Sequence, residues 1–344
     1  MMAAILVAGG AGYVGSHTVI KLLEKDIDVI IADDFSNSDE RVIHAIEAIT
    51  GKTVKSYAVD LTQKEEVRRI FDENEIIGVI DFAGFKSVGT SSKAPLAYYR
   101  NNLEILLNLL SVMQEQGVYH LVFSSSATVY GNPESLPVKE SDKQKPTNPY
   151  GQTKVMSERI LRDLAKSDER WSFISLRFFN PLGAHKSGDL GENPNGVPNN
   201  LAPYITQVAI GKLSELKIFG HDFPTSDGTS VRDYMHVDDL AEGHVAAMEY
   251  LLTTSNKFSG FEALNLGSGK GYSVLEILRA FEQVTGKKIP FEYVEKREGD
   301  AAESFASIEK AKEFLGWEPK YTITDMCLDT WNWQQKHPNG YNEA

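Results

Sequence analysis

The segment that most constrains the fold is VAGGAGYVG, residues 7–15. It ends a short apolar run and opens a stretch with apolar residues at helical spacing, residues 13–25. Gly10, Gly12 and Gly15 fit G-x-G-x-x-G, and Gly9, Gly12 and Gly15 fit the looser G-x-x-G-x-x-G. Glycines here permit a tight turn and let backbone N–H groups approach a pyrophosphate, beside a helix N-terminus that favours negative charge. The segment therefore predicts a dinucleotide-binding strand–turn–helix unit.

Further apolar strands follow, with amphipathic stretches between them. They are DVIIADD (28–34), VKSYAVD (54–60), GVIDFAG (78–84) and HLVFSSS (120–126). Strands that are apolar throughout suit a parallel sheet covered on both faces. We therefore predict an α/β fold with a doubly wound parallel sheet, a Rossmann domain, and a smaller interleaved C-terminal substrate domain.

The amino-acid composition of the chain changes after SLRFFNPLG, residues 175–183. Residues 184–229 are rich in Gly, Pro and Asn and predict loops and short elements of a substrate lobe. Residues 231–252 read as a capped helix with Asp238 or Asp239 near its start. We expect a cofactor domain at residues 1–181, rejoined by about 232–266, and a substrate domain mainly at 182–344.

Carboxylates at the ends of the second and third strands bear on the choice of cofactor. Asp33 lies about 20 residues after the glycines, where a carboxylate accepts the ribose 2′-OH; a strand-end turn is the alternative reading. Asp34 beside it adds charge that repels a 2′-phosphate, so NAD is favoured over NADP. Asp60 is a candidate for the adenine amino group or, equally, a helix N-cap.

A tyrosine and a lysine one helical turn apart lie in NPYGQTK, residues 148–154. Residues at i and i+4 share a helix face. Ser126, at the end of the preceding strand, can face the same crevice as Tyr150 and Lys154, because ligands bind beyond the carboxyl ends of parallel strands. Tyrosine has a pKa of about 10 and a useful base one of about 7. We expect Lys154 and a positive nicotinamide to lower the Tyr150 pKa, so that Tyr150 takes a hydroxyl proton as hydride leaves the substrate carbon.

The net charge, the apolar runs and the cysteine content limit which partners and which location we expect for the protein. The formal net charge is −13, which argues against nucleic acid and anionic membranes. No apolar run is long enough for a transmembrane span, and the N-terminus lacks a basic region typical of a signal peptide. Cys327 is the only cysteine, so we expect no metal site and a cytoplasmic location.

The motifs run in an order that resembles the extended short-chain dehydrogenase/reductase family, and within it the UDP-glucose (UDP-galactose) 4-epimerase branch. The matching segments cover nearly the whole chain: GGAGYVGSHT, DFAGFKSVG, PLAYYRNN, FSSSATVYG, PYGQTK, RFFNPLGAH, GVPNNLAPYI, DGTSVRDYMHVDDLA, NLGSGKGYSVLE, REGD and DTWNWQQKHPNGY. The resemblance implies Tyr150 as base, Lys154 as the group that lowers its pKa and holds the nicotinamide ribose, and Ser126 as a hydrogen-bond partner of the sugar 4-OH.

The same resemblance implies two sets of binding residues. The NAD site comprises Gly9, Gly12, Tyr13, Val14, Gly15, Asp33, Asn37, Asp60, Leu61, Phe82, Ala83, Gly84, Lys86, Asn101, Ser124, Tyr150, Lys154 and Phe178. The UDP-sugar site comprises Lys86, Ser126, Tyr150, Asn180, Asn200, Leu201, Phe219, Arg232, Arg297, Asp300 and Ser304.

Plainer readings remain for several of these residues. Arg232 can pair with Asp233, and Arg297 with Glu298, as surface ion pairs. Asn180 and Asn200 lie beside prolines in loops, so forming turns is their alternative role. Two positions depart from the family pattern: Phe178 replaces the usual tyrosine, and Asp34 stands where asparagine is common.

The implied activity is redox-neutral interconversion of UDP-glucose and UDP-galactose through a 4-keto sugar, with NAD kept bound. A 4,6-dehydratase needs acidic residues where Ala127 and Thr128 stand. A UDP-glucuronate decarboxylase or epimerase needs a pocket for a sugar carboxylate, which the sequence does not exclude. A non-catalytic NAD-sensing regulator would not need Ser126, Tyr150 and Lys154 together.

Two finer expectations concern the substrate and the assembly. Ser304 stands where the family often has a tyrosine that walls the sugar pocket, so we expect N-acetylated UDP-hexosamines to be accepted, unless Glu303 or a nearby loop refills the gap. A helix over residues 95–116 has apolar residues on more than one face. One face can cover the sheet and another would need a partner helix, which predicts a homodimer; burial of all these residues within a monomer is the alternative. These residues are Leu96, Tyr99, Leu103, Leu106, Leu107, Leu110 and Met113.

Overall fold

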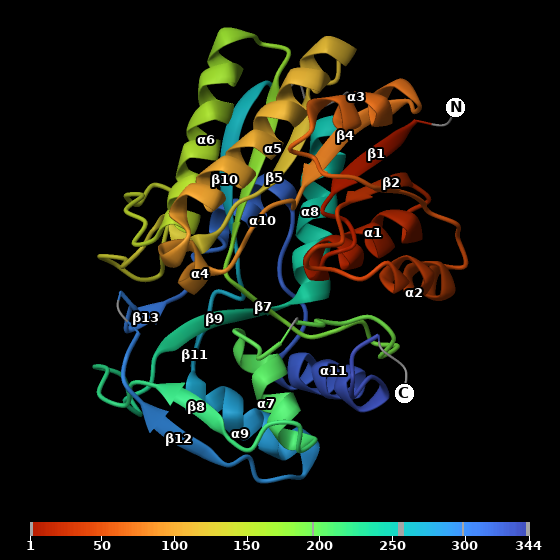
Figure 1. Cartoon of the computed structure of the whole chain (residues 1–344). Helices are drawn as coiled ribbons and strands as arrows, with labels where there is room; N and C mark the ends of the chain where they lie inside the picture. Colours follow the sequence, from red (N-terminus) through yellow and green to blue (C-terminus); the bar gives the residue numbers. More distant parts are fainter. Residues whose placement is uncertain (1–2, 195, 254–257, 298, 342–344) are drawn as a thin grey trace.

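The upper part of the molecule is built on a parallel sheet of seven strands (Figure 1). The computed structural model describes residues 3–194, 196–253, 258–297 and 299–341. The strand order is β10-β6-β5-β4-β1-β2-β3. The strands are β1 (Ala4–Ala8), β2 (Asp28–Asp33), β3 (Lys55–Ala58), β4 (Ile76–Asp81), β5 (His120–Ser124), β6 (Ser172–Phe178) and β10 (Gly260–Leu266). The predicted doubly wound α/β class is confirmed.

Helices cover both faces of this sheet. One face carries α1 (Tyr13–Glu24), α2 (Arg41–Thr50), α8 (Val237–Leu252) and α10 (Glu309–Leu315). The other carries α3 (Lys64–Asp72), α5 (Pro95–Gln116) and α6 (Pro149–Ser167). The short helix α4 (Val88–Lys93) precedes α5, and a 3-10 turn (Ala127–Val129) follows β5.

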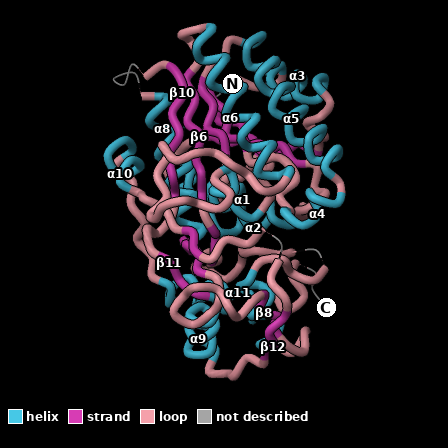
Figure 2. The backbone as a smooth tube through the Cα atoms, turned by 90° about the vertical axis from the view of Figure 1, so that its left-hand side faces the viewer, coloured by secondary structure: helices cyan, strands magenta, loops and turns pink. Residues whose placement is uncertain are grey.

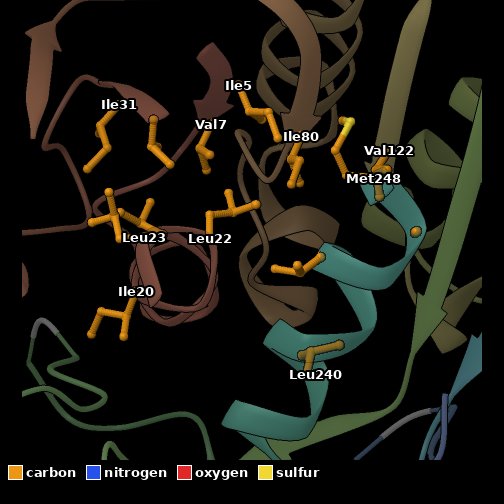
Figure 3. Packing of buried hydrophobic residues seen from close by; sticks show 14 of the residues in the cluster. Ile5, Val7, Ile20, Leu22, Leu23, Ile31, Ile80, Val122, Leu240 and Met248 are labelled. Carbon is orange, nitrogen blue, oxygen red and sulfur yellow. The ribbon is translucent and has the colours of Figure 1, made fainter. Parts of the chain in front are cut away.

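The central strands are buried on both faces, which explains their uninterrupted apolar sequence. Every residue of β1 is buried, and its side chains alternate between two cores. Figure 3 shows the first core, where Ile5 and Val7 face α1 and Leu240 and Met248 project from α8. Burial of apolar surface is the main force that holds these layers together, and it stabilises the fold by about 25 cal/mol per Å² removed from water.

The lower part of the molecule has small sheets packed on three helices (Figures 1 and 2). Strand β9 (Val231–His236) pairs with β7 (Asn180–Leu182), β11 (Gly271–Ser273) and β13 (Glu303–Ser304). Strands β8 (Leu216–Phe219) and β12 (Phe291–Val294) form a separate parallel pair. The helices are α7 (Leu201–Ala209), α9 (Val274–Thr285) and α11 (Ile323–Lys336).

The prediction of one capped helix over residues 231–252 is wrong in its first part. Residues 231–236 form β9, and α8 begins at Val237. The helix is capped by His236, whose ring nitrogen accepts from the backbone of Asp238 at 3.0 Å. The strand conformation is favoured because residues 231–236 pair with both β7 and β11. In addition, the Asp233 carboxylate accepts hydrogen bonds from the backbone N–H groups of Gly269 and Ala306.

The chain passes repeatedly between the two parts. It descends from β6 to β7, returns from β9 to α8, and descends again from β10 to β11. Helix α10 then packs on the upper part, beside β10 and α8, before α11 closes the lower part. The predicted division near residue 181 stays a prediction. No helix within the described residues is both long and apolar enough to cross a membrane.

Candidate active site

The glycine turn after β1 is fixed by close backbone packing. A Cβ atom at Gly15 would lie 2.3 Å from the Gly9 carbonyl oxygen and 2.9 Å from the Gly10 Cα. Gly9 has a φ of 73°, which favours glycine. Gly12 is the N-cap residue of α1 and has no side chain that could cap the helix, so the first backbone N–H groups can meet a diphosphate. This cradle fits the pyrophosphate of a dinucleotide.

Asp33 lies at the end of β2, beside this turn. Its carboxylate accepts hydrogen bonds from the backbone of Ala11 and Phe35, both at 3.0 Å, and from the Ser38 hydroxyl at 2.8 Å. Burial raises the Asp33 pKa, and these bonds oppose that rise. The side chain is thus held in one orientation at the strand end, where a ribose hydroxyl can donate to it.

The remaining residues predicted for the adenosine end lie on adjoining loops. Asn37 is exposed after β2, and Leu61 is buried after β3. The exposed Asp60 accepts from the backbone and hydroxyl of Thr62. Its alternative role as a helix N-cap is wrong, because Gln63 occupies that position of α3.

The loop after β4 carries Phe82, Ala83, Gly84 and Lys86. Its conformation is set by Asn102, which accepts from the backbone of Phe85 at 2.8 Å and donates to its carbonyl at 3.0 Å. Asn102 also donates to Thr153 on α6, and the Asn101 amide donates to Asn102. Phe82 packs on His244, which Phe178 also contacts, so the two predicted aromatic residues meet at the same ring.

Tyr150, Lys154 and Ser126 are brought together where β5 ends and α6 begins. Pro149 occupies the first turn of α6, and Asn148 caps it by accepting from Gly151 at 2.9 Å. Lys154 is buried and donates to the Ser124 carbonyl at 2.7 Å, with its Nζ 5.9 Å from the Tyr150 ring centre. The structure therefore places the predicted Tyr–Lys pair against the strand-end serines.

The proton affinities of this pair follow from burial. Burial raises the pKa of Tyr150 to about 12, a hydrogen bond with Ser126 opposes the rise, and Tyr98 adds to it. Burial lowers the pKa of Lys154 to about 8, against the charges of Asp81 and Glu158. The expected lowering of the Tyr150 pKa by Lys154 and a positive nicotinamide together stays a prediction. Among the protein groups, desolvation dominates the Tyr150 pKa, and the Lys154 ammonium donates to the Ser124 carbonyl.

Two buried carboxylates, Asp81 and Glu158, interact electrostatically with Lys154 and favour its charged form. Asp81 ends β4, is 2% exposed and accepts from the backbone of Ala83. Glu158, one turn beyond Lys154 on α6, accepts from Arg177 at 2.6 Å and from the Ser125 hydroxyl at 2.8 Å. Ser125 lies between Ser124 and Ser126, so this ion pair fixes the backbone that carries both serines.

The predicted substrate residues converge on β9 and its neighbours. Arg232 lies 3.7 Å from Asp300 and is paired across the sheet with Ser304. Its alternative pairing with Asp233 is wrong, because that buried carboxylate is occupied by Ser268 and backbone groups. Asn180 donates to the carbonyl of Asp233 at 2.9 Å.

Arg297 stacks on the ring of Phe219, 3.9 Å from its centre. This contact joins the loop after β12 to the end of β8 and orders two predicted substrate residues together. The alternative partner Glu298 lies outside the described residues. Asp300 follows on the same loop, where its backbone N–H donates to the Arg297 carbonyl at 3.3 Å and its carboxylate lies 3.7 Å from the Arg232 guanidinium.

Asn200 and Leu201 open α7, below the upper sheet. The Asn200 amide donates to Glu192 at 2.6 Å, and Lys86 Nζ lies 3.9 Å from the same oxygen. Tyr13 of the glycine turn donates to the carbonyl of Gly183 at 2.6 Å. These contacts join the upper and lower parts around the carboxyl ends of the strands.

Four of the residues that shape this site were missed by sequence reasoning: Asp81, Asn102, Glu158 and Glu192. Asn102 adjoins Asn101, and Asp81 ends a predicted strand, so their positions held a weak signal. Glu192 lies in an irregular segment, and only the fold brings it to Lys86. Among the described residues, no cluster of three or more acidic, His or Cys side chains could hold a metal.

The parallel sheet, the glycine turn and the Tyr–Lys pair define a dinucleotide-dependent enzyme with its reactive group at the carboxyl edge of the sheet. The family model described as NAD dependent epimerase/dehydratase family matches residues 5–263. The chain belongs to this family, and its cofactor is NAD.

Known proteins match along nearly the entire chain. The UDP-glucose 4-epimerase of Bacillus subtilis is 53% identical over 341 residues, covering 99% of each chain. The crystal structure of UDP-glucose 4-epimerase from Bifidobacterium longum with NAD+ and UDP is 47% identical, with a TM-score of 0.94 and coverage of 99% and 100%. The UDP-Glc/GlcNAc 4-epimerase of Campylobacter jejuni is 33% identical, with a TM-score of 0.83 and coverage of 97% and 100%.

Proposed function

We propose that this enzyme interconverts UDP-glucose and UDP-galactose by inverting the sugar at C4. The observation that carries the proposal is the grouping of Tyr150, Lys154 and Ser126 at the carboxyl edge of the sheet that also carries the glycine turn. The full-length similarity to UDP-glucose 4-epimerases supports it. The enzyme is therefore an isomerase that uses NAD without net oxidation.

Tyr150 takes the proton from the sugar 4-hydroxyl, and Ser126 positions that hydroxyl. When bound, NAD+ supplies the acceptor that takes and returns hydride at C4, together with a positive charge beside the phenol. That charge acts against the burial that raises the Tyr150 pKa to about 12. Lys154 holds the nicotinamide ribose, and its bond to the Ser124 carbonyl sets its position.

The lower part holds the nucleotide while the sugar turns. Arg232 and Arg297 bind the diphosphate, for which a guanidinium fork is well matched. Asn180 and Asn200 bind nearby, Leu201 and Phe219 pack by the uracil, and Asp300 accepts from the uridine ribose. Because these contacts leave the hexose free, the 4-keto sugar can rotate about its diphosphate linkage and present its opposite face.

The substrate range extends to N-acetylated UDP-hexosamines. Ser304 is partly exposed and lies next to Arg232 across the sheet. A serine leaves space there that an aromatic ring would fill, and an acetyl group needs only a few atoms of room. The similarity to a UDP-Glc/GlcNAc 4-epimerase is consistent with this wider range.

The enzyme acts as a homodimer in the cytoplasm. On α5, Leu96 is 71% exposed and Leu107 is 48% exposed, while Leu103 between them is partly exposed. Met156 of the neighbouring helix α6 is also exposed. This stripe suits a second copy of α5 and α6, and light scattering at micromolar concentration tests it through the molecular mass. The single cysteine, Cys327, is buried, which suits a reducing compartment.

A dehydratase is disfavoured by the groups after β5. Elimination of water needs an acid and a base beside the sugar, whereas Ala127 and Thr128 occupy these positions. The Thr128 hydroxyl donates to Ser126 at 3.0 Å and is thereby engaged in holding the serine. The enzyme therefore lacks the groups that would remove a hydroxyl from the keto sugar.

The direct test is an incubation of the purified protein with UDP-galactose and no added cofactor. We expect UDP-glucose to appear, because NAD is retained through a redox-neutral cycle. A parallel incubation with UDP-N-acetylgalactosamine tests the wider substrate range. Chromatography of the nucleotide sugars measures both conversions. Failure to convert UDP-galactose contradicts the proposed function, and failure to convert UDP-N-acetylgalactosamine contradicts the wider substrate range.

A further inference from the structure

Glu192 is a mostly buried carboxylate for which the catalytic cycle described above has no use. It lies on the segment between β7 and α7, and its side chain is 12% exposed. Trp333 of α11 donates to its backbone carbonyl at 3.2 Å. The side chain lines a small cavity that Tyr13 and Gly183 also line. Its backbone is thus anchored, and its carboxylate faces the junction of the upper and lower parts.

One oxygen of this carboxylate engages two residues of the proposed substrate site. The Asn200 amide donates to it at 2.6 Å, and the Lys86 ammonium lies 3.9 Å away. Lys86 comes from the β4–α4 loop and Asn200 from the start of α7. Burial raises the Glu192 pKa, while Lys86 and Asn200 oppose the rise. An ionised Glu192 offsets the charge of Lys86 where the sugar end of the substrate is expected.

We infer that Glu192 is a specificity-determining residue that neutralises Lys86 and thereby excludes UDP-sugars carrying a carboxylate on the hexose. This inference rests on the proposed function, since it takes Lys86 and Asn200 as neighbours of the sugar. A neutral hexose offers hydroxyls that both Glu192 and Asn200 can bind. A hexuronate would bring a second negative charge to a carboxylate that has little water around it.

The physical basis is discrimination by repulsion. Selectivity between two ligands arises as readily from an unfavourable contact with the wrong one as from a favourable contact with the right one. Like charges at short range in a partly desolvated site repel strongly. Removing Glu192 should also release Lys86 to pair with the hexuronate, so the lysine changes from a neutralised group to an anchor.

The experiment compares the dissociation constants of UDP-glucuronate and UDP-glucose on the NAD-loaded enzyme by calorimetry. The ratio of the two constants cancels any general loss of nucleotide binding. We expect Glu192→Gln to shift this ratio at least about fivefold in favour of UDP-glucuronate. Lys86→Met should shift it in the opposite direction, because Glu192 then keeps its charge without a partner.

The double variant Lys86→Met/Glu192→Gln separates repulsion from the release of Lys86. The logarithm of the ratio of dissociation constants should shift in the double variant by at most half of its shift in Glu192→Gln alone. The exposed Glu134, which pairs with Lys145, provides the control Glu134→Gln with an unchanged ratio. If Glu192→Gln leaves the ratio within twofold of wild type, or if Lys86→Met shifts it toward UDP-glucuronate, the inference is overturned.

Conversion of UDP-galactose by the wild-type enzyme shows whether a negative result counts against this inference alone or against the proposed function on which it rests. Absence of that conversion removes the proposed function and the inference with it. Normal conversion with an unchanged ratio in Glu192→Gln removes the inference alone. Should Glu192→Gln not fold, Glu192→Ala, which also removes the carboxylate, takes its place with the same expected shift toward UDP-glucuronate.

Discussion

At the scale of single residues, the proposed chemistry depends on the phenol of Tyr150 as the base. We expect Tyr150→Phe to lose at least about 100-fold in kcat, the usual order for loss of a general base. The ring should still pack at its buried position, so NAD should remain bound. Initial rates with UDP-galactose and the NAD content of the denatured enzyme measure the two effects. Turnover near that of wild type would exclude Tyr150 as the base.

The charge of Lys154 depends on the carboxylate of Asp81. Burial lowers the Lys154 pKa to about 8, and Asp81 works against that lowering. Burial also raises the Asp81 pKa to about 6, so Asp81 is ionised above that pH. In Asp81→Asn the Lys154 pKa should fall further, and the lysine should lose its charge at lower pH. The alkaline limb of the kcat–pH profile should therefore move toward neutrality. An unmoved limb, or a shift to higher pH, contradicts this coupling.

Ser304 is expected to set the room for the sugar. Ser304→Tyr should abolish turnover of UDP-N-acetylglucosamine and leave UDP-galactose turnover within about an order of magnitude, because a steric wall acts on the larger sugar. Ser304→Ala, which adds no bulk at this position, is the control. Rates for both substrates decide the point. A wild-type enzyme inactive toward millimolar UDP-N-acetylglucosamine would refute it.

At the scale of elements, α1 must approach the glycine turn closely. In Gly15→Ala the new Cβ would meet the Gly9 carbonyl oxygen at 2.3 Å, so the turn must shift. We expect NAD to bind at least about tenfold more weakly, which corresponds to about 1.4 kcal/mol. Gly89→Ala on α4 is the matched control, since an added Cβ there meets nothing within 4 Å. Calorimetric titration of NAD compares them, and equal affinities would contradict the close approach.

The central elements could be predicted because their signals are local. The strands of the upper sheet are apolar throughout, and the glycine turn fixes where β1 ends and α1 begins. Strand β9 was predicted as helix because its few residues show no decisive period. Its strand conformation comes from pairing with β7, β11 and β13, which are distant in sequence.

The site divides in the same way. Tyr150 and Lys154 are one turn apart on α6, so their spacing alone predicts their common face. Glu192 and Lys86 are far apart in the chain and meet only when the upper and lower parts close around the strand ends. The pKa of Tyr150 was not predictable from sequence either, since burial sets its direction and burial is a property of the fold.

At the scale of the whole molecule, the two parts divide the work. The upper part holds the cofactor cradle and the base, while Arg232 and Arg297 belong to the lower part. In the proposed cycle the nucleotide is therefore bound away from the reacting carbon, and the sugar can turn between the two parts. Helix α5, which carries the exposed Leu96 and Leu107, belongs to the upper part (Figure 1).

The measurement that tests the central claim most directly uses UDP-galactose with deuterium at C4. The purified enzyme is incubated with it in ordinary water, and the UDP-glucose formed is examined by mass spectrometry. Return of the same hydrogen to C4 predicts that the product keeps its deuterium, with no gain of solvent hydrogen at that carbon. UDP-glucose that has lost the deuterium to water would contradict a redox-neutral inversion at C4.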